Sequence, residues 1–331
     1  MADVAMGAAA LVEERSPGRS KALASLKFGD LVFGRLTQAA AALVLLILSG
    51  VILSLLLGAI PAIRAFGLGF LVSEQWNPVT EKFGALAPII GTVTTSIIAM
   101  AIAAPVGVGI AVFLTELCPQ ALRRPIGIAI ELLAGIPSII YGIWGLFVLA
   151  PFVQAYVEPA IIAVFGPIPV LSSVFAGPPY GIGTLTAGFV LAIMVVPFIA
   201  AVSRDVFDTV PPVLKESAYG IGCTSWEVVR RVVIPYTRVG VIGGMMLGLG
   251  RALGETMAVT FVIGNAHKIT ASLLAPGTTI SATIANEFTE ADGQLYTSSL
   301  IALALILFVI TFLVLAAARL MLARLERRKG R

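Results

Sequence analysis

Two charged residues lie within an otherwise apolar stretch of the sequence, residues 238–264. Arg251 and Glu255 are four positions apart, so on a continuous helix they share a face and can form an ion pair. Each charge costs on the order of 3 kcal/mol near the centre of a membrane helix. Because two apolar residues would avoid that cost, a merely structural salt bridge leaves the presence of both charges unexplained.

The chemistry of this pair points to an anion. A guanidinium offers a planar fork of donors that matches oxyanions such as phosphate. Glu255 would hold Arg251 in position and moderate its field, so that an anion can leave as well as enter. We therefore expect Arg251 and Glu255 to lie on a substrate pathway, either within this chain or between subunits.

Three glycines precede the charged pair at intervals of four residues. Gly240, Gly244 and Gly248 share one helix face, and two overlapping G-x-x-x-G units allow another helix to approach closely. We expect this face to pack against a helix of the same chain. A pore-lining contact with a second subunit is the alternative.

A polar segment separates the fourth and fifth apolar stretches and has the pattern of a helix, a turn and a second helix. Pro211-Pro212 can open the first helix, and Gly222 can supply the turn. Thr224 stands three residues before Glu227, which is the spacing of a capping box. We interpret the segment as a docking site for a partner protein; an amphipathic segment resting on the membrane surface is the alternative.

This segment resembles the E-A-A…G…I-x-L-P coupling loop of the membrane subunits of binding-protein-dependent ABC importers. Ser217 departs from the motif but is still small. The resemblance implies that the loop inserts into a groove of a separate ATPase subunit. The residues that carry it are Glu216, Ser217, Ala218, Gly222, Ile234 and Pro235.

The composition restricts the chain to membrane proteins. Of its 331 residues 58% are hydrophobic and only 12% are charged, with a mean hydropathy of +1.01. A membrane-spanning helix needs about 20 mostly apolar residues. We therefore predict an all-α membrane protein with six transmembrane helices, at approximately 36–60, 85–116, 125–156, 182–203, 238–264 and 298–320.

Two of these stretches contain helix-interrupting residues. Pro105 can kink the second stretch, and Gly135 with Pro137 can break the third. Such breaks survive in a membrane only where protein or a cavity satisfies the freed backbone groups.

Lys and Arg crowd the N-terminal tail, the second connection, the coupling loop at 204–237 and the C-terminus. The positive-inside rule then places both termini and this loop in the cytoplasm of a multi-pass plasma-membrane protein. Because the basic residues flank spans, nucleic-acid binding is not indicated. The predicted organisation is a tail (1–35), a first transmembrane helix with its outer loop (36–84), a core of five helices (85–322) and a basic tail (323–331).

Other polar residues are assigned more modest roles. Thr92, Thr94, Thr95 and Ser96 are expected to bond the backbone of their own helix rather than a substrate. Arg204 is expected to snorkel to the interface, while Glu131 is left open between a gate and a salt bridge. His267 is the only histidine and has no second ligand candidate near it in sequence, so we expect a solvated loop residue and no metal site.

Three segments sharpen the resemblance to the phosphate-transport permeases of the PstC type. They are G-L-G-R-A-L-G-E-T-M-A-V at 248–259, L-A-G-I-P-S-I-I-Y-G at 133–142, and Ser203-Arg204-Asp205 ahead of Val210-Pro211. The resemblance implies a type I ABC importer permease fold and uptake of inorganic phosphate, with Arg251 and Glu255 as the charged residues tied to transport. It also implies three partners: an extracytoplasmic phosphate-binding protein, a second homologous permease and a dimeric ATPase.

Missing motifs narrow the function further. The chain has no G-x-x-x-x-G-K-[ST] loop, so we expect ATP and Mg²⁺ to be used by the partner ATPase, with no cofactor and no enzymatic activity in this chain. A secondary transporter usually has repeated halves, and no internal repeat is evident. Sulfate or molybdate is the alternative cargo, because an arginine fork does not distinguish tetrahedral oxyanions.

Overall fold

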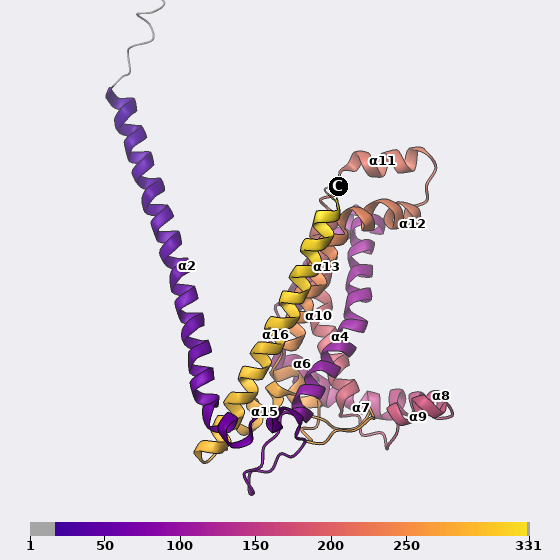
Figure 1. Cartoon of the computed structure of the whole chain (residues 1–331). Coiled ribbons are helices and arrows are strands. Elements are labelled where there is room, and N and C mark those ends of the chain that lie inside the picture. The colour runs from indigo at the N-terminus through magenta and orange to yellow at the C-terminus, as the bar shows by residue number, and fades with distance from the viewer. Residues whose placement is uncertain (1–16, 330–331) are drawn as a thin grey trace, which may run out of the picture. The chain divides into compact units, whose positions relative to one another are not determined.

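The computed structural model describes residues 17–329, which form helices joined by loops, with no β-strand among them (Figure 1). Six of the described helical segments are long and apolar enough to cross a membrane, which confirms the predicted all-α class and the number of spans. They are Gly29–Phe66, Leu86–Leu117, Ser138–Phe165, Thr184–Phe207, Ser225–Leu253 and Gln294–Arg324.

The first span belongs to α2 (Pro17–Phe66), which begins well before the predicted residue 36. Proline is favoured in the first turn of a helix, and no second proline follows until Pro61, so part of the predicted tail is helical. Residues 1–16 of that tail and 330–331 of the C-terminal tail lie outside the described residues. Contacts divide the chain into one unit that ends at Leu57 and another from Gly58, close to Pro61, which cannot donate a helical hydrogen bond.

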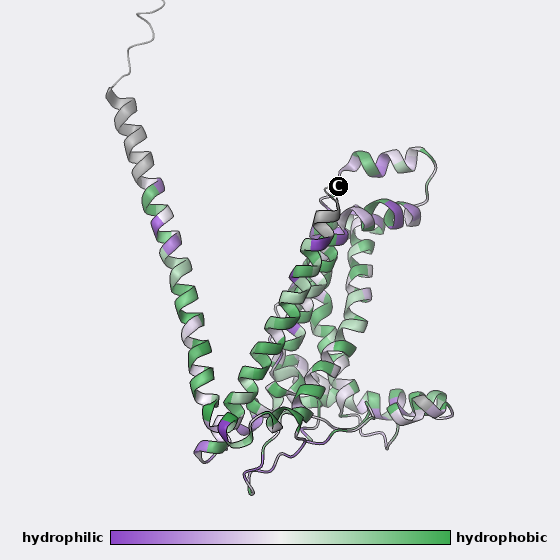
Figure 2. Ribbon diagram, viewed as in Figure 1, coloured by the Kyte–Doolittle hydropathy of each residue, from purple (hydrophilic) through white to green (hydrophobic). Residues whose placement is uncertain are grey.

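The second unit is built around α10 (Thr184–Phe207), the most buried of the six spans. It packs against α4 (Leu86–Val112) and α13 (Ile234–Leu253). Small residues bring the backbones together: a Cβ atom on Gly188 would lie 2.5 Å from Ile98 of α4. Figure 2 shows these helices as mainly hydrophobic along their lengths, with polar residues gathered at the ends.

The third span differs from the prediction of 125–156. α5 (Gln120–Ala134) is a separate helix, and the spanning segment begins at α6 (Ser138–Trp144) and continues to the end of α8 (Glu158–Phe165). Pro137 lacks an N–H group and disfavours helical geometry in the residue before it. The Tyr141 hydroxyl donates to the Leu133 carbonyl across this break at 2.8 Å, which satisfies one backbone group that the break leaves open.

The fifth span also ends earlier than predicted. α13 stops at Leu253, and a short helix, α14 (Met257–Val262), follows after three residues. Before α13, the chain passes through α11 (Pro212–Gly220), α12 (Ser225–Val228) and a π-helical segment, Val229–Val233. α11 and α12 lie at one end of the second unit, and α15 (Ile280–Glu287) lies at the other (Figure 1).

A carboxylate organises the end that contains α15. Glu287 accepts hydrogen bonds from the Trp76 indole (2.6 Å) and the Tyr296 hydroxyl (2.7 Å), and its other oxygen lies 2.8 Å from Nε2 of His267. Burial raises the pKa of Glu287, but these three partners outweigh it, so its pKa lies below the usual value. His267 also stacks on Trp76, so the expectation of a solvated loop residue is wrong.

The last span belongs to α16 (Gln294–Lys329), and its first part fixes the end of α2 that lies in the second unit. The Ser298 hydroxyl donates to the Gly58 carbonyl (2.7 Å) and accepts from the Ala62 amide (2.9 Å). Ser298 lies one turn into α16, on the same side of the helix as Ile301, which contacts Gly58.

Candidate functional site

The candidate pathway residue Arg251 lies near the middle of the second unit. Gly248 of α13 packs against Ile199 and Val195, the latter at the midpoint of α10. Arg251 is therefore about one helical turn beyond that midpoint, toward the end that contains α15. Along the axis of α13, Arg251 is also two residues from the end of the span Ser225–Leu253.

Arg251 and Glu255 do not share a helix face, contrary to the expectation from their spacing. Arg251 occupies the last turn of α13, whereas Glu255 lies in the break before α14. Oε1 of Glu255 accepts from the Ala258 amide at 3.3 Å, so the carboxylate serves the start of α14. In the part of the chain that the structure describes, the two side chains form no ion pair with each other.

Helix ends compensate each of these charges. The carbonyl groups at the end of α13 carry partial negative charge, which favours the Arg251 guanidinium in the last turn. The first amides of α14 carry partial positive charge, which favours the Glu255 carboxylate beside them. Within the described residues, the Arg251 guanidinium therefore has no carboxylate that forms an ion pair with it.

A second interrupted helix packs against this break. Gly142 of α6 faces α14, where an added Cβ atom would lie 2.8 Å from Phe261 and 3.1 Å from the Cα of Ala258. Its neighbour Tyr141 bonds the Leu133 carbonyl across the break that precedes α6. Two interrupted segments therefore pack together at the break that follows Arg251, and transport proteins use broken helices of this kind to form substrate sites.

The three spaced glycines of α13 pack against α10. A Cβ atom on Gly240, Gly244 or Gly248 would lie within 3 Å of a side chain on that helix, at 2.5, 2.9 and 2.9 Å respectively. The side chains concerned are Val206, Val202 and Ile199. This is the intrachain packing that the sequence favours. It fixes the position of Arg251 along the axis of α13 relative to α10.

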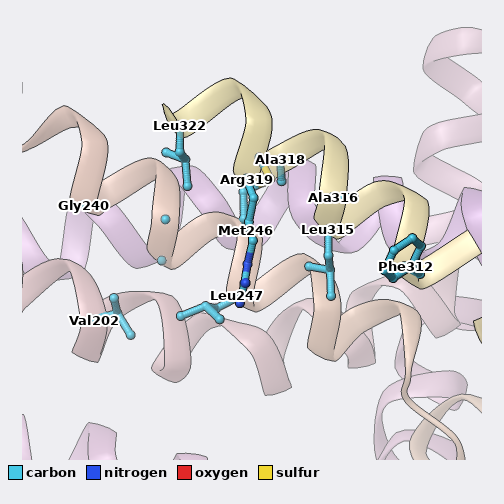
Figure 3. A pocket seen from close by; sticks show the side chains of 12 residues that line it. Val202, Gly240, Met246, Leu247, Phe312, Leu315, Ala316, Ala318, Arg319 and Leu322 are labelled. Carbon is cyan, nitrogen blue, oxygen red and sulfur yellow. The ribbon is translucent and has the colours of Figure 1, made fainter. Parts of the chain in front are cut away.

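Another face of α13 borders an apolar groove against α16, with a volume of about 620 Å³ (Figure 3). Gly243 opens this groove, since an added Cβ atom there would meet nothing within 4 Å. Arg319 extends from α16 toward Met246 and Leu247 and is the only charged side chain among the lining residues. Arg251 does not line the groove, so the groove and the candidate anion site are different places.

The coupling loop has the predicted helix–turn–helix form. Gly222 has a φ of +89°, a conformation that favours glycine. The Thr224 hydroxyl accepts from the Glu227 amide (3.4 Å) and the Glu227 carboxylate accepts from the Thr224 amide (3.0 Å), so the predicted capping box is present.

The loop presents a mixed surface to its surroundings. Glu216, Ser217 and Gly222 are exposed, as are Ile234 and Pro235, whereas Ala218 is buried. Large apolar side chains are also exposed on this loop, with Ile221 at 83%, Val213 at 67% and Trp226 at 64%. An exposed apolar patch rimmed by polar groups is typical of a protein–protein contact.

An ion pair that sequence reasoning missed ties the loop to the transmembrane helices. Lys215 of α11 lies 2.6 Å from Glu116, at the end of the helix that continues α4, and the Glu116 side chain is only 5% exposed. The pair joins residues 99 positions apart. Ala218 adds an apolar contact, in a cluster with Ala111 and Val233.

Further ion pairs lie at the same end of the second unit. Arg204 is paired with Glu131 at 2.6 Å, so the expectation that Arg204 only snorkels is wrong. Arg123 donates to the carbonyls of Leu114 and Thr115 and thereby caps the helix that continues α4. α5 is therefore bonded to the ends of both α4 and α10.

Comparison with known families identifies the class of this protein. The family described as "Binding-protein-dependent transport system inner membrane component" matches residues 103–327, and the chain belongs to this family of ABC importer permeases. Its fold resembles that of a bacterial alginate ABC transporter solved in complex with an alginate pentasaccharide-bound periplasmic protein, with a TM-score of 0.59 and 16% identity over 91% of this chain and 96% of that chain. The predicted type I importer permease fold is confirmed.

Individual relatives are more specific. A protein of Mesorhizobium japonicum called "Phosphate transport system permease protein PstC" is 71% identical over 91% of this chain and 92% of its own length. The protein of the same name from Pasteurella multocida is 56% identical over 91% and 94%. A "Probable phosphate transport system permease protein PstC" of Methanocaldococcus jannaschii is 40% identical over 77% and 82%.

Proposed function

We propose that this chain is a membrane-spanning permease subunit of an ATP-driven importer of inorganic phosphate. The observation that carries the proposal is an arginine in an apolar helix that forms no ion pair among the described residues, in a chain 71% identical to a phosphate transport permease. A guanidinium binds phosphate oxygens through two parallel hydrogen bonds, and the low dielectric of a membrane site strengthens them.

The charge distribution supports an orientation. With both termini and the coupling loop in the cytoplasm, α11 and α12 face an ATPase and the end that contains α15 faces the other side of the membrane. The second homologous permease completes the pathway, and the extracytoplasmic binding protein delivers phosphate. ATP and Mg²⁺ belong to the ATPase, while this chain carries no catalytic step.

Coupling runs through the contacts that hold α11. Movement of an ATPase groove around Glu216 and the exposed apolar residues would move α11 as a body. The Lys215–Glu116 pair passes that movement to the end of α4, which packs along α10, and α10 holds α13 and Arg251. The route is a chain of packed helices, each of which this chain supplies.

Uptake of labelled phosphate tests the proposal. Cells that lack their own phosphate permease receive this chain together with its partner subunits, and phosphate and sulfate uptake are measured in parallel. We expect phosphate uptake that ceases when ATP is depleted. Sulfate uptake alone would leave the importer class intact and change the cargo, whereas uptake that persists without ATP would indicate a secondary transporter.

A further inference from the structure

A small cavity with a mixed polar and apolar lining lies at the end of the second unit opposite the coupling loop, between α4, α10 and the loop that leads to α15. Its volume is about 150 Å³. Pockets for drug-sized ligands are larger, about 300–1,000 Å³, so this cavity suits a small ion with a few water molecules. Neither Arg251 nor any residue of the coupling loop lines it.

Three hydrogen-bond donors on its wall have no partner among the residues that the structure describes. Lys268 of the loop, Thr94 of α4 and Thr184 of α10 all line the cavity. Within the described residues, no acceptor bonds their side chains and no carboxylate pairs with Lys268. An ammonium group and two free hydroxyls, contributed by three separate segments, are donors suited to an anion.

Thr94 departs from the behaviour of the hydroxyls around it. Thr92, Thr95 and Ser96 each donate to a carbonyl one turn earlier in α4, at 2.8 Å, as expected for hydroxyls in a membrane helix. Thr94 makes no such bond and instead lines the cavity. A hydroxyl without a bond to its own helix is free to donate to a ligand.

The wall that contains Lys268 is fixed by hydrogen bonds to neighbouring elements. The amides of Thr184 and Leu185 donate to the carbonyls of Ala275 (3.3 Å) and Leu273 (2.8 Å). The Ile269 amide, next to Lys268, donates to the Glu74 carboxylate at 2.6 Å. These bonds occupy the first amides of α10, so the free donors are side chains on a wall that is already in place.

Close backbone approach fixes the α4 side of the cavity, which stays open to its surroundings at the exposed Lys268. A Cβ atom on Gly91 would lie 1.8 Å from the Thr278 carbonyl oxygen, so only glycine allows the loop to reach α4 here. A site that is ordered before binding loses less entropy when a ligand arrives.

We propose that this cavity is an entry site for a tetrahedral oxyanion, which is inorganic phosphate if the proposed function holds. Lys268 supplies the positive charge, and the hydroxyls of Thr94 and Thr184 donate to the oxygens. A single ammonium group binds an anion more weakly than a guanidinium fork. The site therefore holds the anion briefly before it passes toward Arg251, since conduction requires sites weak enough to release their ion.

Protection of Lys268 from acetylation tests this site. The assembled transporter, in lipid nanodiscs and without binding protein, is treated with N-hydroxysuccinimidyl acetate, and peptide mass spectrometry follows Lys268. Exposed Lys82, in a separate loop at the same end, is the control in the same sample. We expect inorganic phosphate to slow acetylation of Lys268 at least about threefold relative to chloride at equal ionic strength, by mass action, and to leave Lys82 unchanged. Equal rates for Lys268 in both salts would overturn the proposal.

The double substitution Thr94→Val and Thr184→Val separates this cavity from other sources of protection. We expect Lys268 to react at its original rate in chloride and phosphate protection to disappear. Protection that survives both substitutions would place the anion elsewhere and refute the site. The acetylation assay measures binding without transport, so the two proposals can fail separately. If the proposed function is wrong, the uptake assay shows no phosphate uptake. If only the proposed cavity site is wrong, uptake is normal but phosphate does not protect Lys268.

Discussion

Arg251 lies in the last turn of α13 and Glu255 lies in the helix break that follows it, so each is stabilised by a helix end and not by the other. Arg251 is in the last turn of α13, and the Glu255 carboxylate accepts from the Ala258 amide of α14. A direct ion pair would have neutralised the guanidinium. With the break, Arg251 forms no ion pair among the described residues, and the proposed anion pathway requires its charge to be available in this way.

Replacing Arg251 with Gln is expected to abolish phosphate uptake while the transporter still assembles. Charge-assisted hydrogen bonds contribute about 1.5–3 kcal/mol, so uptake should fall by at least about tenfold. Labelled-phosphate uptake is compared with the yield of the purified complex. Arg251→Lys keeps the charge but not the planar fork, and should recover only part of the activity. Normal uptake by Arg251→Gln at normal assembly would remove Arg251 from the pathway.

Replacing Lys215 with Met is expected to separate ATP hydrolysis from transport. Glu116 is nearly buried, so its carboxylate loses its partner, at a cost below the about 3–5 kcal/mol of a fully buried pair because Lys215 is one-fifth exposed. The ratio of phosphate transported to ATP hydrolysed should therefore fall. The exchanged pair Lys215→Glu with Glu116→Lys restores opposite charges and should recover much of that ratio. An unchanged ratio in Lys215→Met would exclude this contact from coupling.

Of two neighbouring glycines of α13, only Gly244 should be sensitive to replacement by Leu. Gly244→Leu forces atoms into Val202, which an added Cβ already approaches to 2.9 Å, and overpacking of this kind costs about 1–3 kcal/mol. Gly243→Leu enters the apolar groove, where nothing lies within 4 Å. Thermal unfolding of the purified complex should show a lower midpoint for Gly244→Leu only. Equal midpoints for both variants would contradict the assigned packing of α13 on α10.

The interruptions in the helices were only partly predictable from sequence. Pro137 is visible as a helix breaker, and the break beside it was expected. The break at 254–256 contains no proline, and its apolar surroundings continue the pattern of a helix. It depends on the packing of α14 against Gly142 of α6, a contact between residues more than a hundred positions apart. The local sequence pattern therefore identifies the two charged residues but does not predict the helix break between them.

The contacts that hold the coupling loop in place are even harder to predict from the sequence. The capping box of Thr224 and Glu227 is local, so its spacing predicted it correctly. The Lys215–Glu116 and Arg204–Glu131 pairs join residues 99 and 73 positions apart, and such pairings follow from the tertiary fold. The same holds for Thr94, which has the same residue type as its neighbours and differs from them only in what it faces.

Reversing the charge of Glu216 is expected to weaken attachment of the ATPase. Glu216 is exposed on α11 beside apolar residues suited to a protein contact. Reversing a charge in such a contact weakens binding of the partner protein more than it affects the fold of this chain. Co-purification of the ATPase with the Glu216→Lys variant measures this directly. Glu290→Lys makes the same change at an exposed position at the other end of the unit and should leave the ATPase attached. Equal amounts of ATPase with the two variants would refute the coupling role of Glu216.

The Glu287 carboxylate, at the end that contains α15, should make the stability of the protein to unfolding depend on pH. Burial opposes its charge, but hydrogen bonds from His267, Tyr296 and Trp76 lower its pKa below the unfolded value. The stabilisation is therefore complete above the unfolded pKa and is lost as the pH falls through the folded pKa. Glu287→Gln should lower the unfolding midpoint at pH 7, and the difference from the original protein should shrink in acid. A difference that stays constant down to about pH 4, where free carboxyl groups are half protonated, would show that the charge of Glu287 does not contribute.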